Sequence, residues 1–200
     1  MMKIAALAVL AGAAVASADV FSNNTPIVIP TGAPGTTGGP STPSTINVAF
    51  GGPVTGATVT LHGLTHTFPA DLDILLVGPA GQTVMLASDQ GGGTDVVLVN
   101  LTFQDGAPAL PAVWVSGTYS PVSPAQSDVI TGAPAGPYGT SVMSAFSANW
   151  NGVWTLYIQD DAGGDIGALE GGWSIELVPT PGAAAMLGLG GLAAMRRRRA

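Results

Sequence analysis

The stretch HTFPADLDILLVGPAG, residues 66–81, and the later stretch NGVWTLYIQD, residues 151–160, decide how this chain folds. Each carries a large apolar side chain at every second position: Leu72, Ile74 and Leu76 in the first, and Trp154, Leu156 and Ile158 in the second. A period of two is typical of a β-strand with one face in a core. The Gly-Pro-Ala-Gly of residues 78–81 favours a turn. Both stretches are therefore predicted to be strands, and residues 83–87 are predicted to return antiparallel to the first.

Shorter runs with the same period flank these two: Ile46, Val48 and Phe50; Val59 and Leu61; Leu64, His66 and Phe68; Val97, Val99, Leu101 and Phe103; Trp173, Ile175 and Leu177. The apolar phase changes at Gly63, which predicts a β-bulge there. The chain contains 29 glycines and 16 prolines in 200 residues, a composition that favours short strands joined by tight turns. We therefore expect an all-β fold, an antiparallel β-sandwich over residues 45–178.

Residues 19–44 are rich in Pro, Gly and Thr and show no sustained period. They are predicted to form a flexible or extended lead-in, in which residues 27–29 can add one edge strand. The chain has no cysteine, so neither a disulfide nor a thiolate metal site can hold the fold. Its stability must come from packing, with bound metal as the remaining aid.

Charge is distributed very unevenly. The cations are Lys3 and the four arginines at 196–199, whereas all twelve acidic residues lie between Asp19 and Val178. A segment with carboxylates and no Lys or Arg repels nucleic acid and anionic lipid, and it attracts metal cations. Nucleic acid is therefore excluded as a partner.

The N-terminus has the pattern of a secretory signal peptide over residues 1–18. Lys3 precedes an apolar run from residue 4 to residue 15, and Ala16 and Ala18 supply the small residues that signal peptidase requires. An N-terminal membrane anchor is the alternative, but the run is too short to span a bilayer comfortably. We expect a signal helix that is removed after Ala18.

The C-terminus, residues 179–200, has three parts: the motif Pro179, Thr180, Pro181 and Gly182, an uncharged apolar stretch, and the cluster Arg196, Arg197, Arg198 and Arg199. A helix over residues 182–195 would be ~20 Å long, short of the ~30 Å hydrocarbon core. Such a short helix can contact a membrane transiently during export, with the arginines on the cytoplasmic side. A simple tail anchor is the alternative.

This arrangement resembles the PEP-CTERM sorting signal of Gram-negative bacteria. The chain departs from the family pattern at Thr180, where the usual motif has Glu between the prolines. The resemblance implies an exosortase-type enzyme that cuts near residues 179–182. It also implies delivery to the cell envelope surface or the extracellular matrix.

The two opening stretches, followed by Gly167, Leu169 and the run WSIEL at 173–177, resemble the P domain (P/Homo B domain) of kexin- and furin-like proprotein convertases. That family has a His-Thr before an Asp-Leu-Asp/Glu strand, a Pro-x-Gly turn, an Asn-Gly-x-Trp-x-Leu strand and a final Trp-Ser-Leu-like strand. Further matching positions are Thr102, Phe103, Gln104, Asp105, Gly117, Tyr119, Pro121 and Phe146. The resemblance spans about residues 45–178 and implies a jelly-roll-like sandwich. In convertases this domain supports a subtilisin-like protease, which 200 residues are too few to include.

Catalysis is not expected. Only His62 and His66 could act as a base near neutral pH, and no Gly-x-Ser-x-Gly motif accompanies them. His66 shares the parity of Leu64, which is typical of a hydrogen-bonded structural histidine.

Metal binding is the stronger chemical hypothesis. Asp160, Asp161 and Asp165 lie in a glycine-rich stretch over residues 160–167, with Glu170 as an extra candidate. Carboxylates and bendable backbone carbonyls are the ligands of Ca²⁺. Asp71 and Asp73 share one face of their strand and form a weaker second candidate. The alternative is that Asp and Gly simply form turns.

Two functions remain open. The first is an exported, surface-sorted, non-catalytic module with a structural, adhesive or extracellular-matrix role, including contact with an envelope polysaccharide. The second is an accessory or inhibitory partner of a separately encoded subtilisin-like serine protease. A free-standing hydrolase is the least favoured class.

Overall fold

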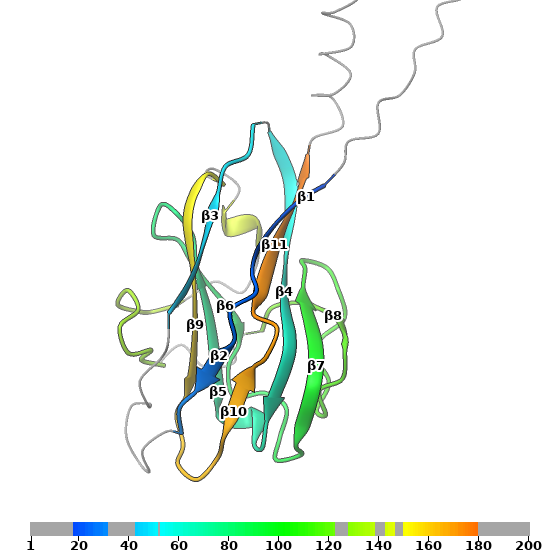
Figure 1. The fold of residues 1–200 in the computed structure, drawn as a ribbon, viewed down its shortest axis with the longest axis vertical. Coiled ribbons are helices and arrows are strands. Elements are labelled where there is room, and N and C mark those ends of the chain that lie inside the picture. The colour runs from blue at the N-terminus through cyan, green and yellow to red at the C-terminus, as the bar shows by residue number, and fades with distance from the viewer. Residues whose placement is uncertain are drawn as a thin grey trace, which may run out of the picture.

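The computed structural model describes residues 18–31, 43–51, 53–122, 128–138, 143–146 and 150–179. Two sheets pack face to face (Figure 1), which confirms the all-β sandwich. In the larger sheet the order is β1 (Asp19–Asn23), β11 (Trp173–Pro179), β4 (Val54–His66), β10 (Gly167–Leu169) and β2 (Ile27–Ile29). Strand β7 (Val96–Phe103) pairs with the other side of β4, and β8 (Gly117–Tyr119) lies beside β7. The smaller sheet is β3 (Ser44–Val48), β9 (Gly152–Asp160), β5 (Leu72–Val77) and β6 (Thr83–Ala87). All pairings are antiparallel except β7 with β8.

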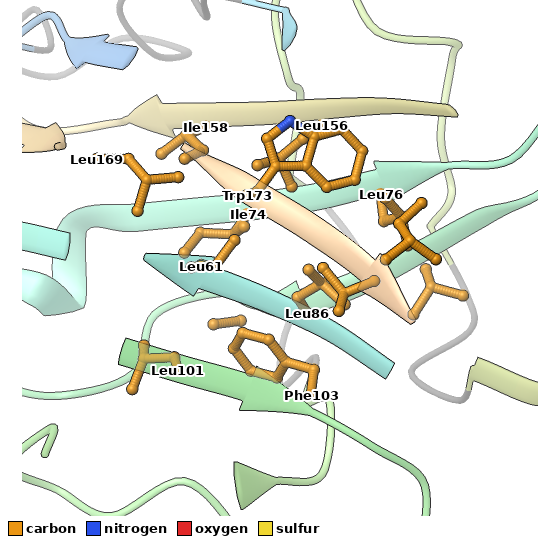
Figure 2. Close-up of a cluster of buried hydrophobic side chains, with 14 of the residues drawn as sticks. Leu61, Ile74, Leu76, Leu86, Leu101, Phe103, Leu156, Ile158, Leu169 and Trp173 are labelled. Carbon is orange, nitrogen blue, oxygen red and sulfur yellow. The ribbon is translucent and has the colours of Figure 1, made fainter. Parts of the chain in front are cut away.

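The core lies between the two sheets, as the period-two pattern predicts (Figure 2). Leu61 and Trp173 of the larger sheet and Ile74 and Leu156 of the smaller sheet belong to one buried cluster. The indole N–H of Trp173 donates to the hydroxyl of Ser44, so the polar atom of this large side chain is satisfied across the sandwich.

Strand β5 is buried on both faces, whereas alternation alone predicts one buried face. Its outer face carries Leu75 and Val77, which pack with Met85, Ile130 and Tyr138 in a second, smaller cluster. The segment 128–138 supplies the last two residues and so covers the outside of the smaller sheet. Because both faces of β5 are buried, the strand carries apolar side chains on both faces and not only at every second position.

Two bulges shape β4 and β7. The register advances from Leu61 to Leu64 on β4 while β7 moves only from Leu101 to Val99, and the predicted bulge residue Gly63 has φ +68°. A second irregularity follows on β7, where Leu98 has φ 53°. Beyond this bulge, the side chains of β7 that face the core are the alternate ones. Val97 is therefore 68% exposed, although its period predicts a core position. Phe68 is also exposed, because β4 ends at His66.

The sandwich begins earlier than the predicted boundary at residue 45. Strand β1 pairs with β11 from Asp19 to Asn23, and β2 pairs with β10. Phe21 packs against the core, and the side chain of Asn23 donates to the backbone oxygen of Thr45. The first part of the lead-in is thus integral to the larger sheet.

The predicted signal helix, with Ala16, and the tail helix lie outside the described residues, as do residues 32–42, Thr180, Pro181, Gly182 and Arg196 to Arg199. Ala18 lies directly before β1, and Pro179 is the last residue of β11. Among the residues described, no helix is long and apolar enough to cross a membrane.

Both ends of the described chain lie at the same end of the sandwich, at the top in Figure 1, because Asp19 is paired with Leu177. The 3-10 helix η2 (Met143–Phe146) is also near this end. The 3-10 helix η1 (Pro69–Asp71), the start of β5 and the loop 161–166 lie at the opposite end.

Candidate functional site

The acidic residues predicted to bind metal meet at the end of the sandwich opposite the chain ends. Asp160, the last residue of β9, is paired with Leu72 at the start of β5. The N–H of Asp161 donates to the backbone oxygen of Asp71 at 2.9 Å. Strand pairing therefore places Asp71, Asp160 and Asp161 side by side, although about ninety positions of sequence lie between the first and the others.

Thr67 fixes the loop that carries Asp165. Its hydroxyl donates to Oδ1 of Asp165 at 3.0 Å and accepts from the N–H of Ile166 at 3.1 Å. The N–H of Thr67 donates to the backbone oxygen of Ile166. These bonds hold Asp165 next to Asp71.

The pKa of Asp71 reports this crowding directly. Burial, the charges of Asp160 and Asp165, and a side-chain hydrogen bond to Asp165 together raise its pKa to about 6. Two carboxyl groups share a hydrogen bond only when one holds a proton, and a cation between Asp71 and Asp165 would offset their repulsion once that proton is lost.

Asp73 belongs to a second acidic group. Its side chain is only 3% exposed, and burial, followed by the charge of Asp128, raises its pKa to about 7, while a hydrogen bond from Ser88 lowers it. The hydroxyl of Ser88 also lies 2.8 Å from Oδ2 of Asp128, so its single proton can serve only one of these two carboxylates at a time. Asp71 and Asp73 were expected to act as a pair on one face, but their neighbours differ.

Asp161 connects the two groups. Burial raises its pKa, and the charges of Asp89, Asp160 and Asp128 raise it further. Sequence reasoning identified neither Asp89 nor Asp128, because no spacing links either one to the glycine-rich stretch. The only available signal was the general absence of cations from this part of the chain.

His66 is fully buried at the base of this site. Its Nδ1 accepts the N–H of Phe68, so the proton of the neutral ring sits on Nε2, which faces Oδ2 of Asp160 at 3.5 Å. Neither Nε2 nor that Oδ2 has a hydrogen-bond partner in the described part of the chain. Gly167 packs directly on the ring, because a Cβ there would lie 2.2 Å from Cδ2 of His66. The imidazole is therefore sealed inside the protein.

A second histidine has a partner that the sequence did not indicate. Nε2 of His62 and Oγ of Ser174 are 2.9 Å apart, on the paired strands β4 and β11. Ser174 is 8% exposed. Within the described ranges no hydrogen bond reaches Nδ1 of His62, whereas a nucleophilic triad uses a carboxylate at that atom.

The acidic end is not a ready-made metal cage. Across the residues that the structure describes, no three His, Asp or Glu side chains gather closely enough to hold an ion. Glu170, the extra candidate, lies instead beside Gly63, to which its N–H donates. The neighbouring carboxylates of Asp71 and Asp165 are the groups that fit a cation best.

No family model and no curated protein matches the chain. Among solved structures, a serine protease of Aeromonas sobria is similar at TM-score 0.41 and 15% identity, over 82% of this chain and 26% of the protease chain. The complex of the Aeromonas sobria serine protease with the chaperone ORF2 is similar at TM-score 0.41 and 17% identity, with the same coverage. The chain thus spans about a quarter of the length of those proteins.

Proposed function

We propose that this chain is an exported, surface-sorted and non-catalytic β-sandwich module with a structural, adhesive or extracellular-matrix role. The observation that carries the proposal is the placement of both chain ends at one end of the sandwich, where Asp19 pairs with Leu177. A module attached through the residues after Pro179 would present its acidic end away from the point of attachment. The terminal pattern of proline motif, apolar stretch and arginine cluster supports attachment at that end.

The test is to isolate the native product from the envelope and to determine its mass. We expect cleavage after Ala18 by a signal peptidase and cleavage within residues 179–182 by an exosortase-type enzyme. A full-length polypeptide in the cytosol, with its arginine cluster intact, contradicts the proposal. Affinity capture from envelope extracts then separates two roles. Polysaccharide or self-association supports the matrix role, and a stoichiometric subtilisin-like protease supports the accessory role.

The non-catalytic part of the proposal rests on the state of the two histidines. His66 is sealed between Phe68, Asp160 and Gly167, so no substrate can reach it without unfolding the site. His62 and Ser174 lie on the paired strands β4 and β11, and within the described residues no carboxylate bonds to Nδ1 of His62. We expect no labelling by a fluorophosphonate serine-hydrolase probe. Labelling that is lost in Ser174→Ala and His62→Ala, but kept in Ser116→Ala, would show that the chain is an enzyme.

We further propose that calcium binds weakly at the acidic end as a structural staple. The carboxylates of Asp71 and Asp165 lie close enough to raise the pKa of Asp71, and Thr67 holds Asp165 in place, so a cation between the two would offset their repulsion. Extracellular calcium sites bind at roughly 10⁻⁴–10⁻³ M, so millimolar calcium should raise the thermal unfolding temperature. Asp71→Asn/Asp165→Asn should abolish the rise and Asp95→Asn should not. An unchanged unfolding temperature in the parent protein removes this idea.

A further inference from the structure

A pocket of about 250 Å³ lies at the end of the sandwich where the described chain begins and ends. Its walls come from residues 54–58 of β4, Val178 of β11, the two residues after β7, the start of η2, and Trp150. The pocket is thus distant from the acidic end, and it is formed by segments far apart in the sequence. No motif in the sequence indicates it.

Its walls are held rigidly. The carboxylate of Asp105 accepts the N–H groups of Met143 at 2.6 Å and Ser144 at 2.9 Å, which fixes η2 against the end of β7. On the other side, the ring of Trp150 stacks on that of Trp154, with centroids 5.9 Å apart and planes at 23°. The indole N–H of Trp154 donates to the backbone oxygen of Trp150. A ligand would therefore meet a preformed surface, which lowers the entropy lost on binding.

The pocket combines an aromatic ring with several hydrogen-bonding groups. Five polar side chains line it besides the indole: Thr55, Thr58, Gln104, Asp105 and Ser144. The Nε1–H of Trp150 is buried without a hydrogen-bond partner within the described residues. An aromatic face with a small number of placed polar groups is the usual composition of a small-molecule site.

This chemistry selects among ligand classes. The carboxylate of Asp105 and the lack of Lys or Arg between Asp19 and Val178 disfavour an anion. Thr55 already donates to the backbone oxygen of Val178, but a purely apolar ligand would leave Thr58, Gln104 and Ser144 without partners, at about 1–3 kcal/mol for each one buried. A neutral sugar ring satisfies both conditions, because it offers hydroxyls around its rim and C–H groups on its faces. The volume is sufficient for a single ring.

We propose that this pocket binds one neutral sugar unit of an extracellular polysaccharide, with Trp150 under the ring and Gln104 and Thr58 as hydrogen-bonding partners. The inference rests on the proposed function, since it gives the matrix role a ligand class and a site. Because Val178 lines the pocket and Pro179 ends β11, the glycan would be held beside the point of attachment.

The experiment titrates the purified processed protein with a panel of neutral oligosaccharides built from glucose, galactose and mannose, with uronate oligosaccharides as the anionic comparison. Tryptophan fluorescence and calorimetry are the two readouts. We expect saturable binding of at least one neutral member, a loss of about tenfold in affinity in Gln104→Ala/Thr58→Ala, and a loss of the fluorescence change in Trp150→Phe. Gln90→Ala/Thr94→Ala removes the same groups at the opposite end and should bind normally.

The outcomes distinguish a failure of the pocket inference from a failure of the proposed function. If no neutral sugar binds, if uronates bind better, or if the pocket variants bind like the parent while their unfolding temperatures are unchanged, the pocket inference is overturned. In the last case, retention of envelope polysaccharide by both the parent and the pocket variants would leave the matrix role standing without this site. A native product that fails to reach the cell surface would instead overturn the proposed function.

Discussion

At the scale of single residues, glycine decides where two strands can approach. Gly172 has φ +66°, and a Cβ at this position would lie 2.0 Å from the backbone oxygen of Asn23. That oxygen belongs to β1, which pairs with β11 just beyond the turn. The absence of a side chain at Gly172 is therefore what allows β1 to dock on the larger sheet.

We expect Gly172→Ala to destabilise the protein far more than Gly106→Ala. Both glycines have positive φ, but nothing lies within 4 Å of a Cβ at Gly106. The control substitution should cost about 1–2 kcal/mol, the conformational penalty alone. Gly172→Ala adds a collision with backbone and should cost several kcal/mol more. Chemical denaturation measures both, and equal losses would contradict the steric explanation.

The buried Asp73 and the partly buried Asp71 give the protein an unusual dependence on pH. The pKa of Asp73 is raised to about 7 and that of Asp71 to about 6, so the folded state binds protons that the unfolded state has released. Their contribution to stability is complete below the ordinary carboxyl pKa near 4 and is lost as the pH rises through about 6 to 7. In the presence of EDTA, which removes the effect of metal, the protein should be more stable at pH 5 than at pH 8.

Asp73→Asn tests this origin. An amide keeps the shape of the side chain but cannot ionise beside Asp128, so thermal unfolding of the variant should show a smaller loss between acid and alkaline pH. Asp95→Asn removes an exposed carboxylate and should keep the parent profile. A parent protein that becomes more stable as the pH rises would refute the argument.

At the scale of elements, the strands that could be predicted are those whose burial comes from one sheet face. Trp154, Leu156 and Ile158 alternate with partly exposed residues on β9, and all three lie in the core. Strand β1 was harder to predict, because it is short and lies in a segment dominated by turn residues, whereas β2 is the edge strand that was predicted at residues 27–29. Their pairing with β11 and β10 is a tertiary effect that no local period encodes.

The same distinction applies to the candidate site. Asp160, Asp161 and Asp165 could be predicted as a group because they are close in sequence, and Asp71 joined them through strand pairing. Asp89 and Asp128 could not be predicted, since each approaches only after β6 and the segment 128–138 have packed. The bulge at Gly63 was predicted from a change of phase, whereas the positive φ of Leu98 has no local signal.

Removal of β1 and β2 tests the revised boundary. A chain that begins at residue 45 should unfold at a lower temperature than one that begins at residue 19, because it loses the packing of Phe21 and leaves an edge of β11 unpaired. Hydrogen exchange should show faster exchange along β11 in the shorter chain and unchanged exchange along β5. Equal unfolding temperatures would restore the boundary at residue 45.

At the scale of the whole molecule, repulsion between carboxylates dominates the electrostatics. Asp71, Asp73 and Asp161 each have a pKa raised in part by neighbouring carboxylates. In the described part of the chain, the one contact between groups that can carry opposite charge joins His66 and Asp160. Added salt should therefore screen more repulsion than attraction.

We expect the unfolding temperature in EDTA at pH 8 to rise as NaCl increases from about 0.02 to about 0.5 M, over which the screening length falls several-fold. Asp89→Asn/Asp128→Asn should show a smaller rise, because part of the repulsion is already gone. Asp95→Asn serves again as the exposed control. A fall in stability with salt would mean that attractive ion pairs outweigh the repulsion.

The position of β11 also governs how the molecule would bear mechanical load. The strand lies between β1 and β4, and it ends at Pro179, where a tether would begin. A pull on that tether, resisted by a partner at the far end, acts along the strand. The backbone hydrogen bonds to β1 and to β4 then share the force in shear. A pull applied between the two chain ends would instead peel β1 from β11 one rung at a time, starting at Asp19. Tethering through the C-terminus alone thus directs tension along the stronger of these two directions.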